Sequence, residues 1–340
     1  MNHLESAFRG KNSFWRYIIM ILSVFIVSNT IGAIPILISI AIKSASDPGV
    51  IAQIAANPND FSGLGLGPNV WFLMMMFPFI AGLTAFILLI KPLNNRSLKI
   101  TINGTEKIRW KRFFISAFVW LVLSALYLFF YVKFDPSNFK INNNTISLLF
   151  LSIITVVFIP FQAAFEEILF RGYLMQGFAV LIRNRWFPVV MTSILFGLMH
   201  SLNPEVKAFG FFTMIPQYIV FGLIFGIITV LDDGIEATMG AHTANNIFLC
   251  IMVTNGSSAL QTPALYEQFR IHPWVDFVAL TLTGILFIFI LKIIFKWENF
   301  GILFGKIKPS PDKVLFNLLP PSKPSPKGEG AKPPFPPWGK

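Results

Sequence analysis

Two glutamates and an arginine, Glu166, Glu167 and Arg171, occur in the segment FEEILFRGYL at 165–174, within one of the most apolar parts of the chain. Charged side chains are costly inside a bilayer and usually mark a functional site there. Glu167 and Arg171 are four residues apart with the acid first, the arrangement that favours an ion pair within one helix. Glu166 projects about 100° away and has no basic residue three or four positions from it. We therefore expect Glu166 to face a neighbouring helix.

Two of the four histidines also lie in apolar helices, His200 in SILFGLMHS and His242 in TMGAHTANNIF. Asn246 follows His242 by four residues, so both project from the same helical face. A carboxylate and an imidazole in a dry cavity can activate a water by general-base catalysis. A second imidazole and an amide can stabilise an oxyanion. Glu166, His200, His242 and Asn246 together are therefore the groups needed to hydrolyse an amide bond.

Other hydrolytic chemistries have less support. No GxSxG motif surrounds a membrane serine, HExxH is absent, and the single cysteine, Cys250, has no catalytic motif around it. Two histidines and a glutamate are also a catalytic zinc ligand set, so residue types alone leave open a zinc site formed by Glu166, His200 and His242. Asn246 is a good hydrogen-bond donor and a poor zinc ligand. Its position therefore favours water activation without a cofactor.

Helical rise gives a rough depth for each group. Glu166 precedes Arg183 by 17 residues, about 25 Å, and His200 follows Arg185 by 15 residues, about 22 Å. His242 follows Asp233 by only 9 residues, about 13 Å. This estimate predicts that Glu166 and His200 lie at one level and that His242 lies several ångströms from it. A turn LDDGIEA that sits below the membrane surface would close the difference.

The composition indicates a membrane protein. The 340 residues are 54% hydrophobic and 13% charged, whereas soluble domains contain about 25% charged residues. The sequence predicts an all-α, polytopic membrane helical bundle with about eight transmembrane spans, and Pro160 is expected to kink the longest of them. The predicted spans cover 17–42, 70–90, 113–132, 147–182, 186–202, 211–231, 237–254 and 274–295.

Lysine and arginine indicate the orientation of the spans. With the N-terminus in the cytoplasm, the cytoplasmic segments 1–16, 91–112, 183–185, 232–236 and 296–340 hold 20 Lys and Arg, and the opposite segments hold 5. The chain is therefore predicted to be a multi-pass cell-membrane protein with both termini in the cytoplasm. The same distribution explains the net charge of +11 without a nucleic acid partner. The oligomeric state stays open.

We divide the chain into four regions. An N-terminal membrane region with three spans covers 1–145, and the polar residues described above fall in a core at 146–255. A last loop and span cover 256–296. The segment 297–340 is rich in proline and lysine and is predicted to be a disordered tail. The segment 43–69 is predicted to be an external loop rich in Gly, Asn and Pro.

Three motifs occur in order within the core. EEILFR fits EExxxR, FGLMH fits FxxxH and HTANN fits HxxxN. In this order on successive apolar helices they resemble the CAAX protease and bacteriocin-processing (CPBP, or Abi) family of intramembrane endopeptidases. The resemblance implies that Glu166 and His200 activate water, that His242 and Asn246 hold the oxyanion, and that Glu167 and Arg171 orient the site. It also implies a metal-free mechanism on a protein or peptide substrate, although the family is often labelled as metalloproteases.

Two other functions use the same residues. A non-catalytic membrane immunity or scaffold protein of this family can keep all three motifs. A transporter would use buried charges as an ion or proton path, but transporters often show inverted repeats around broken helices, and the sequence has no such symmetry. Transport is therefore the weaker alternative.

Overall fold

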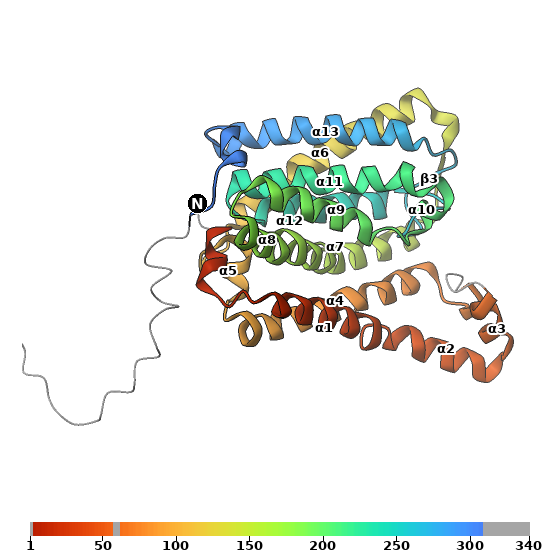
Figure 1. Ribbon diagram of the computed structural model, residues 1–340. Helices are drawn as coiled ribbons and strands as arrows, with labels where there is room; N and C mark the ends of the chain where they lie inside the picture. The colour runs from red at the N-terminus through yellow and green to blue at the C-terminus, as the bar shows by residue number, and fades with distance from the viewer. Residues whose placement is uncertain (1–2, 57–61, 309–340) are drawn as a thin grey trace, which may run out of the picture.

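The protein is an all-α bundle of long helices that lie side by side (Figure 1). The computed structural model describes residues 3–56 and 62–308. The α-helices are α1 Phe14–Thr30, α2 Ile34–Ser46, α3 Gly49–Ala56, α4 Pro68–Asn94, α5 Leu98–Asn103, α6 Trp110–Phe134, α7 Thr145–Glu167, α8 Met175–Ile182, α9 Trp186–Met199, α10 Pro204–Phe209, α11 Phe211–Asp232, α12 Glu236–Met252 and α13 Pro273–Phe295. The predicted tail beyond residue 308 lies outside the described residues.

Six helical segments among the described residues are long and apolar enough to cross a membrane. They are Phe14–Ser46, Pro68–Asn94, Trp110–Phe134, Thr145–Ile182, Phe211–Asp232 and Pro273–Phe295. The other two predicted spans fall on α9 and α12, which have 14 and 17 residues. These lengths correspond to about 21 and 26 Å, less than the ~30 Å of a bilayer's hydrocarbon core. The chain is thus a multi-pass membrane protein, and α12, which carries His242 and Asn246, is not among its six long apolar segments.

The longest predicted span departs from α-helical geometry after Glu167, a change of helix type that the sequence did not predict. Helix α7 continues through Pro160 to Glu167, because a proline in a membrane helix can be accommodated by neighbouring helices and side chains. The change comes at Ile168–Leu174, which is π-helical and leads into α8. Single π-helical turns are frequent at functional sites. In the predicted external loop 43–69, α3 occupies Gly49–Ala56, and residues 57–61 lie outside the described part.

The described parts of the five segments predicted to share one membrane side contact one another. The N-terminal segment joins three of them: His3 N donates to Asp233 Oδ1 at 3.0 Å, Lys11 N donates to Asn94 O at 2.8 Å, and Glu5 pairs with Arg185. The amide of Ile307 donates to Arg183 O at 2.8 Å, which brings the segment after α13 to the same place. The grouping required by the charge pattern is therefore present in the fold.

The turn between α11 and α12 is buried at this end of the bundle. Arg109 contacts Glu236 at 2.5 Å and Asp232 at 3.2 Å, and Arg112 contacts Asp232 at 2.9 Å. Both acids are almost inaccessible to solvent. Burial by itself would raise the pKa of Glu236, but the hydrogen bonds and charge of Arg109 outweigh it and lower that pKa. Helix α12 therefore starts inside the protein rather than at its surface.

A small sheet closes the opposite end of the bundle, where Figure 1 shows β3 far from α5. Its strands are β1 Phe139–Ile141, β2 Val253–Thr254 and β3 Tyr266–Gln268, in the order β1-β3-β2. β1 is antiparallel to β3, with Phe139 opposite Gln268, and β2 is parallel to it, with Val253 opposite Tyr266. The sheet ties the ends of α6 and α12 to the segment that precedes α13.

A glycine sets the distance between α6 and α12. A Cβ atom at Gly240 would lie 2.0 Å from the carbonyl oxygen of Phe113, so a larger residue would force the helices apart. Further along the same pair, Trp120 Nε1 donates to Asn245 Oδ1 at 3.1 Å. Close packing through small residues is typical of membrane helices. The contact holds α12, and with it His242 and Asn246, at a fixed position against α6.

The charge pattern predicts which end of the bundle faces the cytoplasm. In a Cys250→Ser background, Lys107→Cys and Lys140→Cys each place one thiol at an exposed position, at opposite ends of the bundle. We expect a membrane-impermeant maleimide added to intact cells to label Lys140→Cys and to label Lys107→Cys only after lysis. Labelling of Lys107→Cys in intact cells would show that the orientation is the reverse of the predicted one.

Candidate active site

The site is built around the carboxylate of Glu167 at the end of α7. Its Oε1 atom accepts one hydrogen bond from Arg171 Nη1 at 2.8 Å and another from His242 Nδ1 at 2.8 Å. All three residues are buried, with exposed fractions of 0%, 0% and 3%. One oxygen atom therefore connects α7, the π-helical turn and α12.

Arg171 lies within the π-helical segment, where its guanidinium reaches back to Glu167. The guanidinium also lies 4.3 Å from the centre of the Phe196 ring, a cation–π contact that replaces part of its hydration. Its backbone carbonyl is contacted by His3 Nε2 at 3.0 Å. The ion pair predicted from the spacing of Glu167 and Arg171 is confirmed, and the N-terminal segment lies directly behind it.

Glu166 faces α12, as expected for the carboxylate without a basic partner on its own helix. Its Oε1 accepts a hydrogen bond from Gln162 Nε2 at 2.6 Å. Its Oε2 lies 3.7 Å from His242 Nε2. The imidazole of His242 is thus placed between two carboxylates, with a direct bond to Glu167 and a longer approach to Glu166.

The depth estimate for His242 was wrong. It placed His242 several ångströms from the level of Glu166, whereas the ring contacts Glu167 directly and approaches Glu166. The cause is the buried turn before α12, the alternative that the sequence left open. Because Asp232 and Glu236 bond to arginines inside the protein, counting residues from Asp233 underestimates the depth of everything after it.

Asn246 is held by a chain of amides that the sequence analysis missed. Its Nδ2 donates to Gln162 Oε1 at 2.8 Å, and its Oδ1 accepts from Asn245 Nδ2 at 2.9 Å. Asn245 in turn accepts the indole N–H of Trp120. The donors of these hydrogen bonds all point in one direction, toward Glu166. One of the two Nδ2 hydrogens of Asn246 is not used in this series of hydrogen bonds. The available signal was Gln162 itself, an amide in an apolar helix four residues before Glu166.

His200 lies beside this group without a hydrogen bond to it among the described residues. It follows the end of α9, and its Nδ1 lies 2.7 Å from the carbonyl oxygen of Phe196. Its ring is stacked on Tyr218, with centroids 4.1 Å apart and an interplanar angle of 18°. The Phe196 ring is 4.6 Å from the His200 ring and 6.2 Å from the His242 ring, so it touches both. The structure thus brings five of the six predicted residues into direct or amide-bridged contact, with His200 next to them.

The arrangement does not fit a zinc site. A zinc ion held by Glu166, His200 and His242 would need all three ligands at about 2.0–2.2 Å. Within residues 3–56 and 62–308, no three His, Cys, Asp or Glu side chains are grouped to hold a metal ion. We therefore derive no catalytic step through a metal.

Comparisons with known proteins agree with the motifs. Residues 145–248 match the family model described as Type II CAAX prenyl endopeptidase Rce1-like. This match agrees with the resemblance to the CPBP family that the three motifs indicate. The matched segment contains all six candidate residues of the site. The Rce1-like core is thus the part of the chain in which α7, the π-helical turn, α9 and α12 meet.

A second comparison extends beyond the Rce1-like core. The chain is 28% identical over 282 residues to the uncharacterized protein YyaK of Bacillus subtilis (strain 168), which covers 82% of this chain and 91% of YyaK. The similarity is longer than the core and therefore includes flanking membrane helices. No solved structure matches the chain.

Replacement of Glu167 is predicted to destabilise the protein more than replacement of its neighbour. Glu167→Gln leaves Arg171 buried without a carboxylate, at a cost of about 3–5 kcal/mol. Glu166→Gln is the matched control, because its amide oxygen can still accept from Gln162. Thermal unfolding of the purified proteins in detergent measures the difference. Equal unfolding temperatures for the two variants would contradict the assigned roles.

The geometry also predicts the metal content. Elemental analysis of protein purified without chelators is expected to show far less than one zinc per chain. A chelator is expected to leave cleavage of a substrate unchanged. About one zinc per chain, lost together with activity in His200→Ala, would establish a metal site instead.

Proposed function

We propose that the chain is an intramembrane endopeptidase that hydrolyses a peptide bond with a water held between Glu166 and His242. One observation supports this most strongly: the buried imidazole of His242 has Nδ1 2.8 Å from Glu167 and Nε2 3.7 Å from Glu166. The Rce1-like family match supports the same class of reaction. The substrate is a protein or peptide whose identity these residues do not specify.

The hydrogen-bond partners determine where the histidine protons lie. Glu167, paired with Arg171, is an acceptor, so His242 Nδ1 carries the hydrogen of that bond. The carbonyl oxygen of Phe196 can only accept, so His200 Nδ1 also carries a hydrogen. In a neutral imidazole the Nε2 atom is then an acceptor. Both histidines thus have a lone pair on Nε2 with which to bind a water or take up a proton.

Two acceptors 3.7 Å apart can share one water at hydrogen-bond distance from each. Such a water donates one hydrogen toward Glu166 Oε2 and the other toward His242 Nε2, which leaves its oxygen lone pairs free for attack. This function for His242 is more direct than the oxyanion contact implied by the family resemblance. His200 lies at the edge of the same group and can polarise the water or orient the substrate.

The proposed reaction balances within these residues. The water oxygen bonds to the peptide carbonyl carbon as one water proton passes to Glu166. The unused Nδ2 hydrogen of Asn246 stabilises the oxyanion, a contact whose removal typically lowers kcat by about 10²–10³. The C–N bond then breaks, and Glu166 returns the proton to the leaving nitrogen. The products are a carboxyl group and an amine.

A non-catalytic immunity or scaffold protein is the main alternative, because a buried polar cluster can also connect helices. One feature favours catalysis. Glu167 Oε1 is engaged by both Arg171 and His242, whereas Glu166 Oε2 and His242 Nε2 face each other at more than hydrogen-bond distance. If this pair served only to hold α7 and α12 together, its two atoms would be expected to lie within direct hydrogen-bond distance. We further propose a location in the cell membrane with both termini in the cytoplasm.

The test compares membrane proteomes of cells that express the wild type or Glu166→Gln at equal levels. We expect new peptide termini to appear with the wild type and to be absent with Glu166→Gln, because an amide cannot accept the water proton. Glu267→Gln, an exposed acid on β3, is the matched control and should cleave like the wild type.

Asn246→Ala gives a second, graded measurement on any substrate found in this way. We expect kcat to fall by about 10²–10³ while the protein remains folded. Identical termini in the wild type and Glu166→Gln would contradict the peptidase and favour the scaffold.

A further inference from the structure

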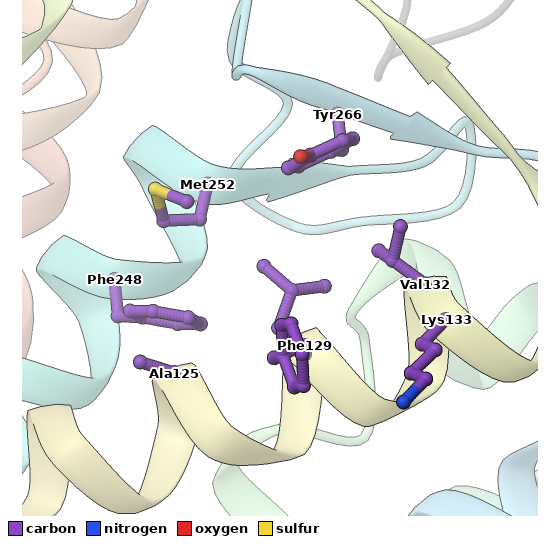
Figure 2. A pocket seen from close by; sticks show the side chains of 8 residues that line it. Ala125, Phe129, Val132, Lys133, Phe248, Met252 and Tyr266 are labelled. Carbon is purple, nitrogen blue, oxygen red and sulfur yellow. The ribbon is translucent and has the colours of Figure 1, made fainter. Parts of the chain in front are cut away.

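A pocket between α6 and α12 lies outside the candidate active site. It has a volume of about 390 Å³ and is lined by Ala125, Leu128, Phe129, Val132, Lys133, Phe248, Met252 and Tyr266. Figure 2 shows Phe248 and Met252 from α12 facing Ala125 and Phe129 from α6, with Tyr266 of β3 near the far end. We call this pocket the α6/α12 groove. Its volume is within the ~300–1,000 Å³ typical of ligand sites.

The groove follows from the way the two helices pack. At their first turns, Gly240 brings α12 against the backbone of α6. Near the last turns of the two helices, α12 carries Phe248 and Met252 in place of a small residue. The two backbones therefore cannot approach as closely there as they do at Gly240. Ala125, Phe129 and Lys133 are spaced four residues apart and form one stripe of about 12 Å along α6. The groove therefore runs along the helices, parallel to the direction expected for a lipid chain.

The groove is apolar except at one end. Phe129 is 58% exposed, and the hydrophobic residues along the stripe belong to a helix long enough to span a membrane. Lys133, in the last turn of α6, is exposed and has no salt-bridge partner among the described residues. Long basic side chains near helix ends extend toward the membrane interface. An ammonium without a salt-bridge partner among the described residues thus lies at the end of the apolar α6/α12 groove, in the last turn of a helix long enough to span a membrane.

We propose that the α6/α12 groove binds one acyl chain of an anionic phospholipid, with the headgroup phosphate near Lys133. Charge complementarity selects this occupant, because a zwitterionic lipid offers the apolar chain without net negative charge. One lysine near an anionic lipid surface contributes about a fivefold change in affinity. Because α12 also carries His242 and Asn246, a lipid in the groove contacts the opposite side of a helix of the active site.

Native mass spectrometry tests the proposal. The full chain is released from nanodiscs that contain equal amounts of palmitoyl-oleoyl phosphatidylglycerol and phosphatidylcholine. Wild type is expected to retain phosphatidylglycerol at least fivefold over phosphatidylcholine. Lys133→Gln should abolish this preference, whereas Lys140→Gln, an exposed lysine at the same end of the bundle, should keep it. Ala125→Trp should fill the groove and lower retention of both lipids. Leu126→Trp, its exposed neighbour outside the groove, should not.

Any one of four outcomes would overturn the proposal. Equal retention of the two lipids by the wild type would remove the charge selection. Unchanged selectivity in Lys133→Gln would place the anionic lipid elsewhere, and unchanged retention in Ala125→Trp would mean that the lipid does not enter the groove. Retention of detergent or of a second protein chain in place of lipid would also contradict it. Since Lys133 and Ala125 are both exposed, neither Lys133→Gln nor Ala125→Trp removes a buried contact.

Discussion

The candidate site depends on a single buried oxygen atom, Oε1 of Glu167. It accepts from Arg171 and from His242, two residues that no other polar contact joins directly. A carboxylate in a low-dielectric interior is tolerated only when it is paired and hydrogen-bonded. The positive charge of Arg171 balances the carboxylate, and the hydrogen bond to the carboxylate fixes the orientation of the His242 ring. Loss of this atom would therefore affect both charge balance and the position of the proposed catalytic imidazole.

The rest of the fold keeps this contact in place from two directions. Helix α12 is pressed against α6 at Gly240 and tied to it by Trp120, so the histidine cannot withdraw from α7. At the other side, the N-terminal segment contacts the backbone of Arg171 through His3 and the turn before α12 through Asp233. Arg109, directly before α6, and Arg112, in its first turn, neutralise the acids of that turn. The site is thus enclosed by parts of the chain that lie outside the Rce1-like core.

Much of this site could be predicted from the sequence, because charge inside an apolar helix is rare and helical spacing is regular. Glu167 with Arg171, the free face of Glu166, and the shared face of His242 and Asn246 all follow from positions four residues apart. Gln162 was missed because a single amide is less conspicuous than a charge. The depth of His242 was wrong because helical rise measures distance from a turn, and only tertiary contacts decide how deep that turn lies.

The fold, like the site, was predicted where it depends on local sequence and was missed where it depends on tertiary contacts. Hydrophobic runs predicted every long helix, since a membrane span must satisfy its own backbone hydrogen bonds. They did not predict the π-helical turn at Ile168–Leu174, which depends on how Arg171 and its neighbours pack. Nor did they predict the short strands, such as Tyr266–Gln268, whose pairing partners are far apart in sequence. The segments that charge counting assigned to one membrane side do contact one another, whereas their side of the membrane stays a prediction.

The central claim is that Glu167 holds His242 with its proton on Nδ1, leaving Nε2 toward Glu166. Nitrogen NMR of protein labelled with ¹⁵N-histidine reports directly which ring nitrogen carries hydrogen, and His242→Gln assigns the signal among the four histidines. The account predicts hydrogen on Nδ1 of His242 at neutral pH, and loss of this preference in Glu167→Gln. A neutral His242 with hydrogen on Nε2 and none on Nδ1 would contradict it.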